Sequence, residues 1–435
     1  MKKREKNNTL ENKSETDTKK AKRKKGNKAV LVGTIVFLVG VLGYAGFETD
    51  YLWRTKRQVE QVIIGRTRIQ GATYIGDMDW GVFEGAGTLT CESGTTLSGN
   101  WSNNYLQGRG TATYEDGSSY NGEYDLSLHN GQGVFEWSNG DHYTGDWEND
   151  LINGSGCYTW NNGDIYTGEF KKGKASGKGE YQWVNGDSYS GEFKSGKPNG
   201  SGVLQFSTGE SYTGKFVKGE YSGEGTFVYP KLGKYVGAFN DSMRNGNGTF
   251  TWDNGNVYSG EWTDDLITGD GKVTFKNKDV LEGEFKKGVL REGRYETVQK
   301  GVTYIIHISQ NEITKATVTF ADGTTCTGEC SDNAFNGEAE IVYANGDKYE
   351  GNLSEGKKDG EGTYTWQDGA KYTGEWKDDM MNGTGTYYYQ SDSSGYKLTG
   401  EFSDNKPNGT CKYYTSSDKS YETTWSDGKC VKLTE

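Results

Sequence analysis

The chain has 435 residues, a formal net charge of −12, 32% hydrophobic residues, and 66 glycines against three prolines. Its length would suit two or three globular domains, but so few hydrophobic residues argue against one large core. Aromatic residues make up 13% of the chain, and disordered segments are poor in aromatics, so disorder does not describe most of it.

The N-terminal region differs from the rest of the chain. Residues 1–28 hold twelve Lys or Arg against four acidic residues, and Ala29–Phe47 follows without a charge. At about 1.5 Å per residue, these nineteen positions reach about 28 Å, which suits a transmembrane helix. A cleaved signal peptide is the alternative, but the preceding basic region is too long for an ordinary one. Residues 48–72 would prolong the helix as a stalk or linker.

Charge asymmetry predicts the orientation of this helix. The basic cluster before the apolar stretch outweighs the few cations after it, so residues 1–28 are expected to form a cytoplasmic tail. The sequence therefore predicts a single-pass protein of the cell membrane, with the remainder of the chain extracellular.

From Tyr74 onward a pattern recurs every 23 residues. One copy reads Tyr143-Thr-Gly145-Asp-Trp147, then Gly154-Ser-Gly156, then Trp160-Asn-Asn-Gly163. The first glycine recurs at Gly76, Gly99, Gly122, Gly145, Gly168, Gly191, Gly214, Gly237, Gly260 and Gly283, and again at Gly328, Gly351, Gly374 and Gly400. A fixed period of this size indicates a stacked repeat array, in which each unit buries a face against its neighbours.

Each repeat is expected to be a β-hairpin. Asn-Gly or Asp-Gly closes most repeats, as at Asn139-Gly140 and Asn162-Gly163, and such pairs are typical of tight type I′ turns. Between these turns, aromatic residues and glycines alternate with polar residues, which predicts one aromatic face and one polar face. Glycine on the aromatic face would leave room for rings from the adjacent strand.

These units, with Tyr-x-Gly-x-Trp/Phe, Asn-Gly-x-Gly and a closing aromatic-x-Asn/Asp-Gly, resemble the MORN (membrane occupation and recognition nexus) repeat over residues 73–430. The resemblance implies an all-β fold, an elongated array of about sixteen 23-residue hairpins in one long twisted antiparallel sheet. It also implies scaffolding, partner binding and, in some members, self-association through array ends. It does not imply a common chemistry.

The pattern weakens at two places. Residues 302–327 lose the paired glycines, and Ile306 stands where a glycine is expected. This segment is either a joint between an array at 73–301 and a second array at 328–435, or a repeat that degenerated without consequence. The final unit, around Tyr421 and Trp425, reads as a C-terminal cap or as an edge available for dimerisation.

One candidate partner-binding feature is an acidic ladder on the polar face. The residue after the repeat glycine is acidic in ten units: Asp77, Glu123, Asp146, Glu169, Glu192, Glu261, Glu284, Glu329, Glu375 and Glu401. A spacing of about 9–10 Å between units is too wide for shared Ca²⁺ chelation. The ladder is either a solvated face or a docking surface for a basic partner.

A second candidate is the aromatic face itself, represented by Tyr143, Trp147, Trp160, Tyr166, Trp183, Tyr258, Trp262, Trp366, Tyr372 and Trp376. Most of these rings are expected in the core. If one side of the sheet were uncovered, exposed rings would instead suit sugar rings or a peptide.

No catalytic, metal or cofactor site is predicted. The histidines His129, His142 and His307 lack a paired nucleophile or second ligand at suitable spacing. Cys326 and Cys330 would lie about 13 Å apart along one strand, too far for a disulfide. A bridge between Cys411 and Cys430 would need an irregular end.

We therefore predict a non-enzymatic, membrane-anchored scaffold for protein–protein interaction or self-association at the cell envelope. The expected partners are the membrane, through Ala29–Phe47, and a basic protein or a second copy. Nucleic acid is excluded because the array is acidic. The alternative is a cell-wall or carbohydrate-binding module that uses the aromatic face.

Overall fold

The computed structural model describes residues 71–389, 396–415 and 419–434. The predicted tail, the apolar stretch at 29–47 and the stalk up to residue 70 lie outside the described residues. Within the described residues, no helix has the length and apolar character needed to span a bilayer.

The fold is all-β, as predicted. The described residues form 32 strands that belong to one sheet, and thirty-two strands make sixteen hairpins. The residues divide into two compact units, which are described separately below. The first unit contains the described residues up to Pro230 together with Val236–Met243, and the second contains Lys231–Tyr235 and the described residues from Arg244 onward.

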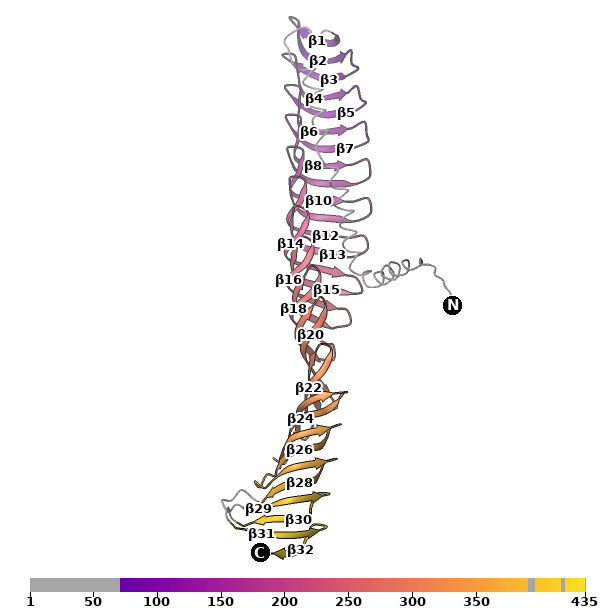
Figure 1. The fold of residues 1–435 in the computed structure, drawn as a ribbon. Coiled ribbons are helices and arrows are strands. Elements are labelled where there is room, and N and C mark those ends of the chain that lie inside the picture. Colours follow the sequence, from indigo (N-terminus) through magenta and orange to yellow (C-terminus); the bar gives the residue numbers. More distant parts are fainter. Residues whose placement is uncertain (1–70, 390–395, 416–418, 435) are drawn as a thin grey trace, which may run out of the picture. The chain divides into compact units, whose positions relative to one another are not determined.

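The strands of the first unit follow one another in chain order (Figure 1). They are β1 Ala72–Asp79, β2 Val82–Cys91, β3 Thr96–Ser102, β4 Tyr105–Thr113, β5 Ser119–Asp125, β6 Leu128–Glu136, β7 His142–Glu148, β8 Leu151–Thr159, β9 Ile165–Lys171, β10 Lys174–Gln182, β11 Ser188–Lys194, β12 Lys197–Gln205, β13 Ser211–Val217 and β14 Glu220–Tyr229. Residues of β15 (Gly233–Asn240) belong to both units.

The second unit continues the same pattern. Its strands are β16 Met243–Trp252, β17 Val257–Thr263, β18 Leu266–Thr274, β19 Val280–Lys286, β20 Val289–Gln299, β21 Val302–Ser309, β22 Glu312–Thr319, β23 Thr325–Ser331, β24 Ala334–Val342, β25 Lys348–Ser354, β26 Lys357–Thr365, β27 Lys371–Lys377, β28 Met380–Tyr388, β29 Lys397–Ser403, β30 Lys406–Tyr414, β31 Ser420–Ser426 and β32 Lys429–Thr434. The hairpin β21–β22, which covers the degenerate repeat, pairs with both neighbouring strands. Whether it acts as a joint stays a prediction.

Alternation along each strand separates two faces as expected. In β7, Tyr143 and Trp147 are buried while Thr144 and Glu148 are exposed. We call the face with the buried rings the inner face and the opposite face the outer face. Strand β7 pairs with β8, so that Tyr143 lies opposite Tyr158 and Gly145 lies opposite Gly156.

The core is a series of aromatic rings in edge-to-face contact. Tyr143 makes perpendicular contacts with Trp147 of its own strand, with ring centres 5.4 Å apart, and with Phe170 of the next repeat, at 5.3 Å. The pattern continues from Phe170 to Tyr166 at 5.0 Å. Because rings favour this geometry over face-to-face stacking, each repeat is tied to the next through its aromatic edges.

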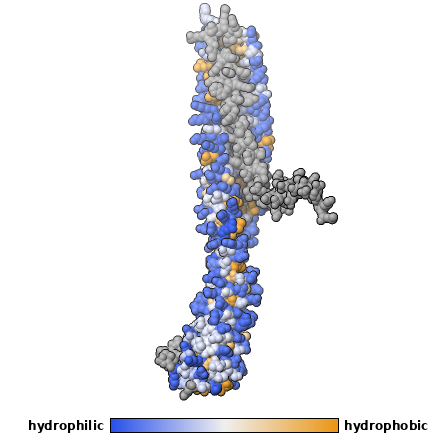
Figure 2. Space-filling view, in the orientation of Figure 1, coloured by the Kyte–Doolittle hydropathy of each residue, from blue (hydrophilic) through white to orange (hydrophobic). Residues whose placement is uncertain are grey.

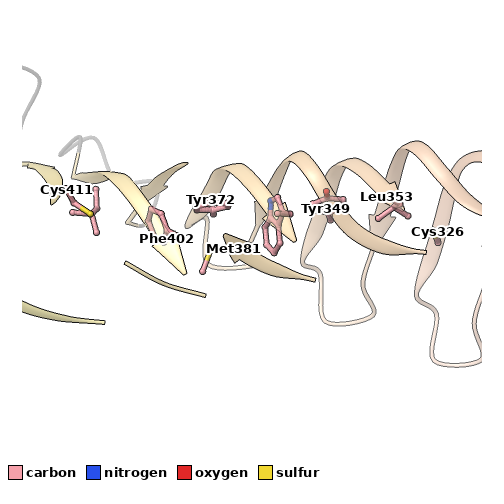
Figure 3. Close-up of a cluster of buried hydrophobic side chains, with 9 residues drawn as sticks. Cys326, Tyr349, Leu353, Tyr372, Met381, Phe402 and Cys411 are labelled. Atoms are coloured by element: carbon pink, nitrogen blue, oxygen red, sulfur yellow. The ribbon is translucent and has the colours of Figure 1, made fainter. Parts of the chain in front are cut away.

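The second unit repeats this arrangement. Tyr349 and Tyr372 both contact Trp376 edge to face, at 5.5 and 5.3 Å, and Tyr372 contacts Phe402 at 5.0 Å. Figure 3 shows these side chains in a buried cluster that extends from Cys326 to Cys411.

Paired glycines make room for these rings, as the sequence predicted. The Tyr143 hydroxyl donates to the Asp146 carbonyl oxygen at 3.0 Å, which holds the ring over Gly145 and Gly156. A Cβ atom on Gly156 would collide with the Tyr143 ring. The glycines therefore let a whole tyrosine lie flat on the sheet.

The prediction of type I′ turns at Asn-Gly and Asp-Gly is wrong. In the loop that contains Asn139-Gly140, only the glycine has a positive φ, of 90°. The Asn139 side chain instead accepts a hydrogen bond from the Asp141 amide at 3.0 Å, and Gly140 donates to the Trp137 carbonyl. An Asx turn needs asparagine only as an acceptor, so these pairs close wider loops between hairpins.

The two-residue turns occur at the opposite ends of the strands. Asn103-Asn104 and Asn149-Asp150 have positive φ at both positions, which is the type I′ geometry. Other repeats use Lys172-Gly173 or Leu126-Ser127 at this place. The side chains are too varied for the sequence to have marked these turns.

Candidate partner-binding surface

Most of the predicted aromatic face is core. Tyr143, Tyr166, Tyr258 and Tyr372 are at most 1% exposed, and the rings of Trp147, Trp262 and Trp376 are also buried. Trp160, Trp183 and Trp366 are half-buried. Seven of the ten rings are therefore closed to a ligand.

The three half-buried tryptophans belong to a second aromatic row. Trp160 lies between Tyr158 and Tyr181, with ring centres 4.6 and 5.2 Å away. Trp183 follows Tyr181 at 4.6 Å, and Trp366 lies between Tyr364 and Tyr387. These rings pack against each other along the repeats, and the three tryptophans stay partly exposed.

The acidic ladder lies on the outer face and has a structural role that the sequence did not reveal. In each regular hairpin, the pairing slips after the first repeat glycine, for example between Gly145 and Trp147. The Asp146 carboxylate accepts a hydrogen bond from the Ser155 amide at 2.7 Å inside this bulge. The carboxylate thus satisfies a backbone donor that the bulge leaves unpaired.

The same contact recurs along the ladder. Carboxylates of Asp77, Glu169, Glu192 and Glu375 accept from the amides of Ala86, Lys178, Ser201 and Thr384, at 2.9–3.3 Å. The side chains of Glu123, Glu261 and Glu329 lie where Cβ atoms on Gly131, Gly269 and Gly337 would be. The first glycine of each Gly-x-Gly therefore also makes room for an acidic side chain. Glu284 is an exception. Its repeat lacks the first glycine of the Gly-x-Gly, and Glu284 lies opposite Glu292.

Replacing Glu169 with alanine is expected to destabilise the β9–β10 hairpin by about 1 kcal/mol, because the Lys178 amide loses an acceptor on an exposed face. Amide hydrogen exchange of residues 174–182 measures this loss. Glu180→Ala is the matched control, since the Glu180 carboxylate bonds to the Gln182 side chain. Equal effects of the two substitutions would contradict a capping role for Glu169.

Charge is concentrated in the first repeats. Residues 71–170 contain fifteen Asp and Glu residues, one arginine, Arg109, and no lysine. In the second unit, lysines pair with carboxylates, as in Lys272–Glu282 at 2.6 Å and Lys357–Asp378 at 2.9 Å. Hydrophilic residues cover most of the surface in view, and apolar residues are scattered singly (Figure 2). Three of the fifteen carboxylates, those of Asp141, Asp150 and Asp164, are buried, and the other twelve make the exposed surface over residues 71–170 acidic.

Sequence reasoning missed a buried carboxylate in each Asn-Gly-Asp loop. Asp164 is 3% exposed and accepts from the Tyr181 hydroxyl and from the Val184 amide, both at 2.9 Å. Asp141 and Asp347 accept the same two hydrogen bonds, each from a tyrosine hydroxyl and a backbone amide of the following repeat. Recurrence of Asp directly after Asn-Gly was the available signal. These carboxylates connect each loop to the next repeat.

His129 is a buried histidine within a strand. It lies in β6 and is 1% exposed. Its Nε2 is 2.9 Å from the Tyr114 hydroxyl, and its Nδ1 is 3.4 Å from an Asp150 carboxylate oxygen. Burial lowers the pKa of His129 to about 3. Leu106 and Ile152 occupy the same place in neighbouring hairpins.

This histidine should make stability depend on pH. The pKa of His129 in the folded protein is below its unfolded value of about 6.5. The free energy of unfolding is therefore unaffected by this group above pH 6.5 and decreases as the pH falls toward 3. We expect wild type to lose about 2 kcal/mol more than His129→Leu between pH 7 and pH 5, measured by urea unfolding. A matching loss in the variant would show that His129 is not the cause.

The described residues contain no group of three His, Cys, Asp or Glu side chains that could hold a metal ion. All six cysteines are free, and burial raises the pKa of the Cys326 thiol to about 11.

Comparison with known families finds the MORN repeat. It matches residues 74–96, 98–119, 120–142, 143–165, 166–188, 189–211, 212–233, 235–257, 258–280, 349–371, 372–394 and 399–419. These twelve segments cover more than half of the chain. No curated protein matches.

Three of the matching solved structures are distant likenesses. The TCP domain of SAS-4 (dCPAP) of Drosophila melanogaster, in complex with a proline-rich motif of Ana2 (dSTIL), is 16% identical over 39% of this chain and 85% of that chain, with a TM-score of 0.22. The TCP10 domain of Danio rerio CPAP, in complex with a STIL peptide, is 12% identical over 64% and 93%, with a TM-score of 0.19. A streptogramin B lyase is 12% identical over 70% and 95%, with a TM-score of 0.11. TM-scores this low carry no argument about function.

Proposed function

Since the chain belongs to the MORN repeat family, we propose that it is a non-enzymatic scaffold whose first unit docks a basic protein on its outer face. The observation that supports this most is the acidic surface over residues 71–170, with a single arginine among twelve acidic residues that are not buried. A surface of one sign attracts a partner of the other sign and orients it.

The ladder carboxylates serve two purposes in this proposal. They accept hydrogen bonds from backbone amides at the bulges, and they contribute to the electrostatic field of the outer face. Other exposed acidic residues are Glu115, Glu136 and Glu148. Glu136 lies 3.9 Å from His142, and Glu148 accepts a hydrogen bond from the Asn153 side chain at 2.6 Å. Glutamine removes the charge at these positions and retains a carbonyl acceptor, so the fold should tolerate the change.

The membrane anchor is part of this proposal. Nineteen uncharged residues at 29–47, after a basic tail at 1–28, would hold the array outside the cell membrane, with residues 48–72 as a stalk. Protease added to intact cells should then remove the repeats and spare the tail. Repeats that stay protected would contradict this orientation.

Two alternatives have less support. Glycan binding by the aromatic face would have to use the three half-buried tryptophans, because the other seven rings are buried. Self-association would use the end strands: Ile75 of β1 is 75% exposed, Trp80 beside it is 98% exposed, and Leu433 of β32 is 61% exposed. Exposed strand edges pair readily with other strands.

The test uses immobilised full-length chain in detergent, loaded with native envelope extract and eluted with a salt gradient. A partner bound through the acidic surface should elute at moderate salt, and earlier from the triple variant Glu115→Gln, Glu136→Gln, Glu148→Gln. The matched control, Glu338→Gln, Glu361→Gln, Glu422→Gln, removes three exposed acidic residues from the second unit and should elute as wild type does. Salt-resistant recovery of glycan, or of the chain itself, would favour one of the alternatives.

A further inference from the structure

The outer face of the second unit carries a row that interleaves lysine and tyrosine. Lys371 of β27 lies opposite Tyr388 of β28, which lies opposite Lys397 of β29, which lies opposite Tyr414 of β30. We call these four residues the lysine–tyrosine row. The Nζ atoms of Lys371 and Lys397 lie 4.6 and 4.7 Å from the ring centres of Tyr388 and Tyr414. Lys412 lies 5.5 Å from the Tyr414 ring.

The fold does not require these residue types. In the first unit, the corresponding positions hold His142 opposite Thr159, Ile165 opposite Gln182, and Ser188 opposite Gln205. These pairs fold into the same hairpin. The alternation of lysine and tyrosine is thus a local departure from the repeat.

The charges of the row are available to a ligand. By contrast, the lysine one hairpin earlier is engaged: the Nζ atom of Lys348 lies 2.6 Å from Glu340 and 2.8 Å from Glu350. Lys371, Lys397 and Lys412 form no ion pair with a carboxylate of the described residues. Their cation–π contacts hold the ammonium groups over the rings without neutralising them.

The spacing of the row suggests the form of the ligand. Lys371 and Lys397 lie two strands apart, so their Cα atoms are separated by about 10 Å. Threonine hydroxyls accompany them on the same face, including Thr386 and Thr399, which are 3.0 Å apart. Alternating cations, tyrosine rings and hydroxyls along one line fit a linear chain that carries sparse negative charges and many hydroxyl groups.

We propose that the lysine–tyrosine row binds a linear acidic polysaccharide that carries about one carboxylate per disaccharide. Such a chain places its charges about as far apart as the two lysines and offers hydroxyls to the tyrosine and threonine side chains. A nucleic acid carries a phosphate at every nucleotide, which is denser charge than lysines about 10 Å apart can match. The acidic surface elsewhere on the chain therefore repels it more strongly than it repels a sparsely charged polysaccharide. This surface does not depend on the partner proposed for the first unit, because it uses other strands.

The test is titration of the detergent-solubilised full-length chain with a fluorescent hyaluronan decasaccharide, which has one carboxylate per disaccharide. The double variant Lys371→Gln, Lys397→Gln is expected to weaken binding about tenfold, as expected for loss of charge-assisted contacts. Lys371→Arg, Lys397→Arg should retain binding. Lys194→Gln, Lys197→Gln is the matched control in the first unit, where both lysines are exposed, and it should bind as wild type does.

Thermal unfolding of each variant shows whether the fold is intact. The proposal is overturned if hyaluronan does not bind, if the double glutamine variant binds as wild type does, or if neutral dextran binds equally well. Tighter binding of poly-glutamate or oligothymidylate than of hyaluronan would also overturn it, in favour of an acidic protein or a nucleic acid.

Discussion

Replacement of Gly156 with alanine is expected to destabilise the hairpin β7–β8 by about 3 kcal/mol, because the new methyl group would overlap the Tyr143 ring. That ring has no room to retreat. Trp147 and Phe170 hold its edges at 5.4 and 5.3 Å, and its hydroxyl is tied to the Asp146 carbonyl. Hydrogen exchange of residues 142–159 in the full-length chain measures the loss.

Gly117→Ala is the matched control for this experiment. Gly117 has a φ of 87°, and a Cβ atom there would meet no heavy atom within 4 Å. Substitution by alanine should destabilise the fold only through the strain of the left-handed backbone conformation, by about 1 kcal/mol. If the two variants lose equal stability, the edge-to-face ring contacts of the core do not depend on the paired glycines.

Asp164→Ala should cost about 3 kcal/mol, because it leaves one buried and one partly buried donor without an acceptor. The Tyr181 hydroxyl and the Val184 amide both bond to this carboxylate at 2.9 Å. The donors lie one repeat beyond Asp164, so the loss should appear as faster exchange in β10 and in the loop after it, as well as in β9.

Asp164→Asn separates hydrogen bonding from charge. The amide oxygen can accept from the Val184 amide, and the amide nitrogen can donate to the Tyr181 hydroxyl. We expect a cost below about 1 kcal/mol. An asparagine variant as unstable as the alanine variant would mean that the negative charge, rather than the hydrogen bonds, joins the repeats.

Regular spacing made the fold predictable. Because the period is fixed, alternation in one repeat, such as Tyr143 and Trp147 against Thr144, assigns faces in all repeats. The hairpin content and the core therefore followed from the sequence. The two-residue turns did not, because Leu126-Ser127 and Lys172-Gly173 share no turn residue that marks both.

The polar contacts were hidden for a different reason. Asp146 and Asp164 are both acidic residues in polar segments, but one caps a bulge on the outer face and the other is buried. Sequence alternation predicts which face a residue points to, and it does not predict a register slip. Only the slip after Gly145 brings the Asp146 carboxylate to the Ser155 amide.

The candidate surface could be predicted only in part. The acidic ladder was visible as a repeated position, whereas the burial of seven of the ten aromatic rings depends on how rings of successive repeats interlock. Tyr143 is fully covered because Phe170 of the next repeat lies against it.

The central claim is that the outer face binds the partner while the inner face serves as core. Photo-crosslinking of the full-length chain in intact cells tests it most directly. A photoreactive phenylalanine derivative replaces exposed Thr167 on the outer face or half-buried Trp183 on the inner face. The account predicts a protein cross-linked from position 167, with a yield that falls as salt increases, and little from position 183. A partner cross-linked from position 183 and not from position 167 would contradict it.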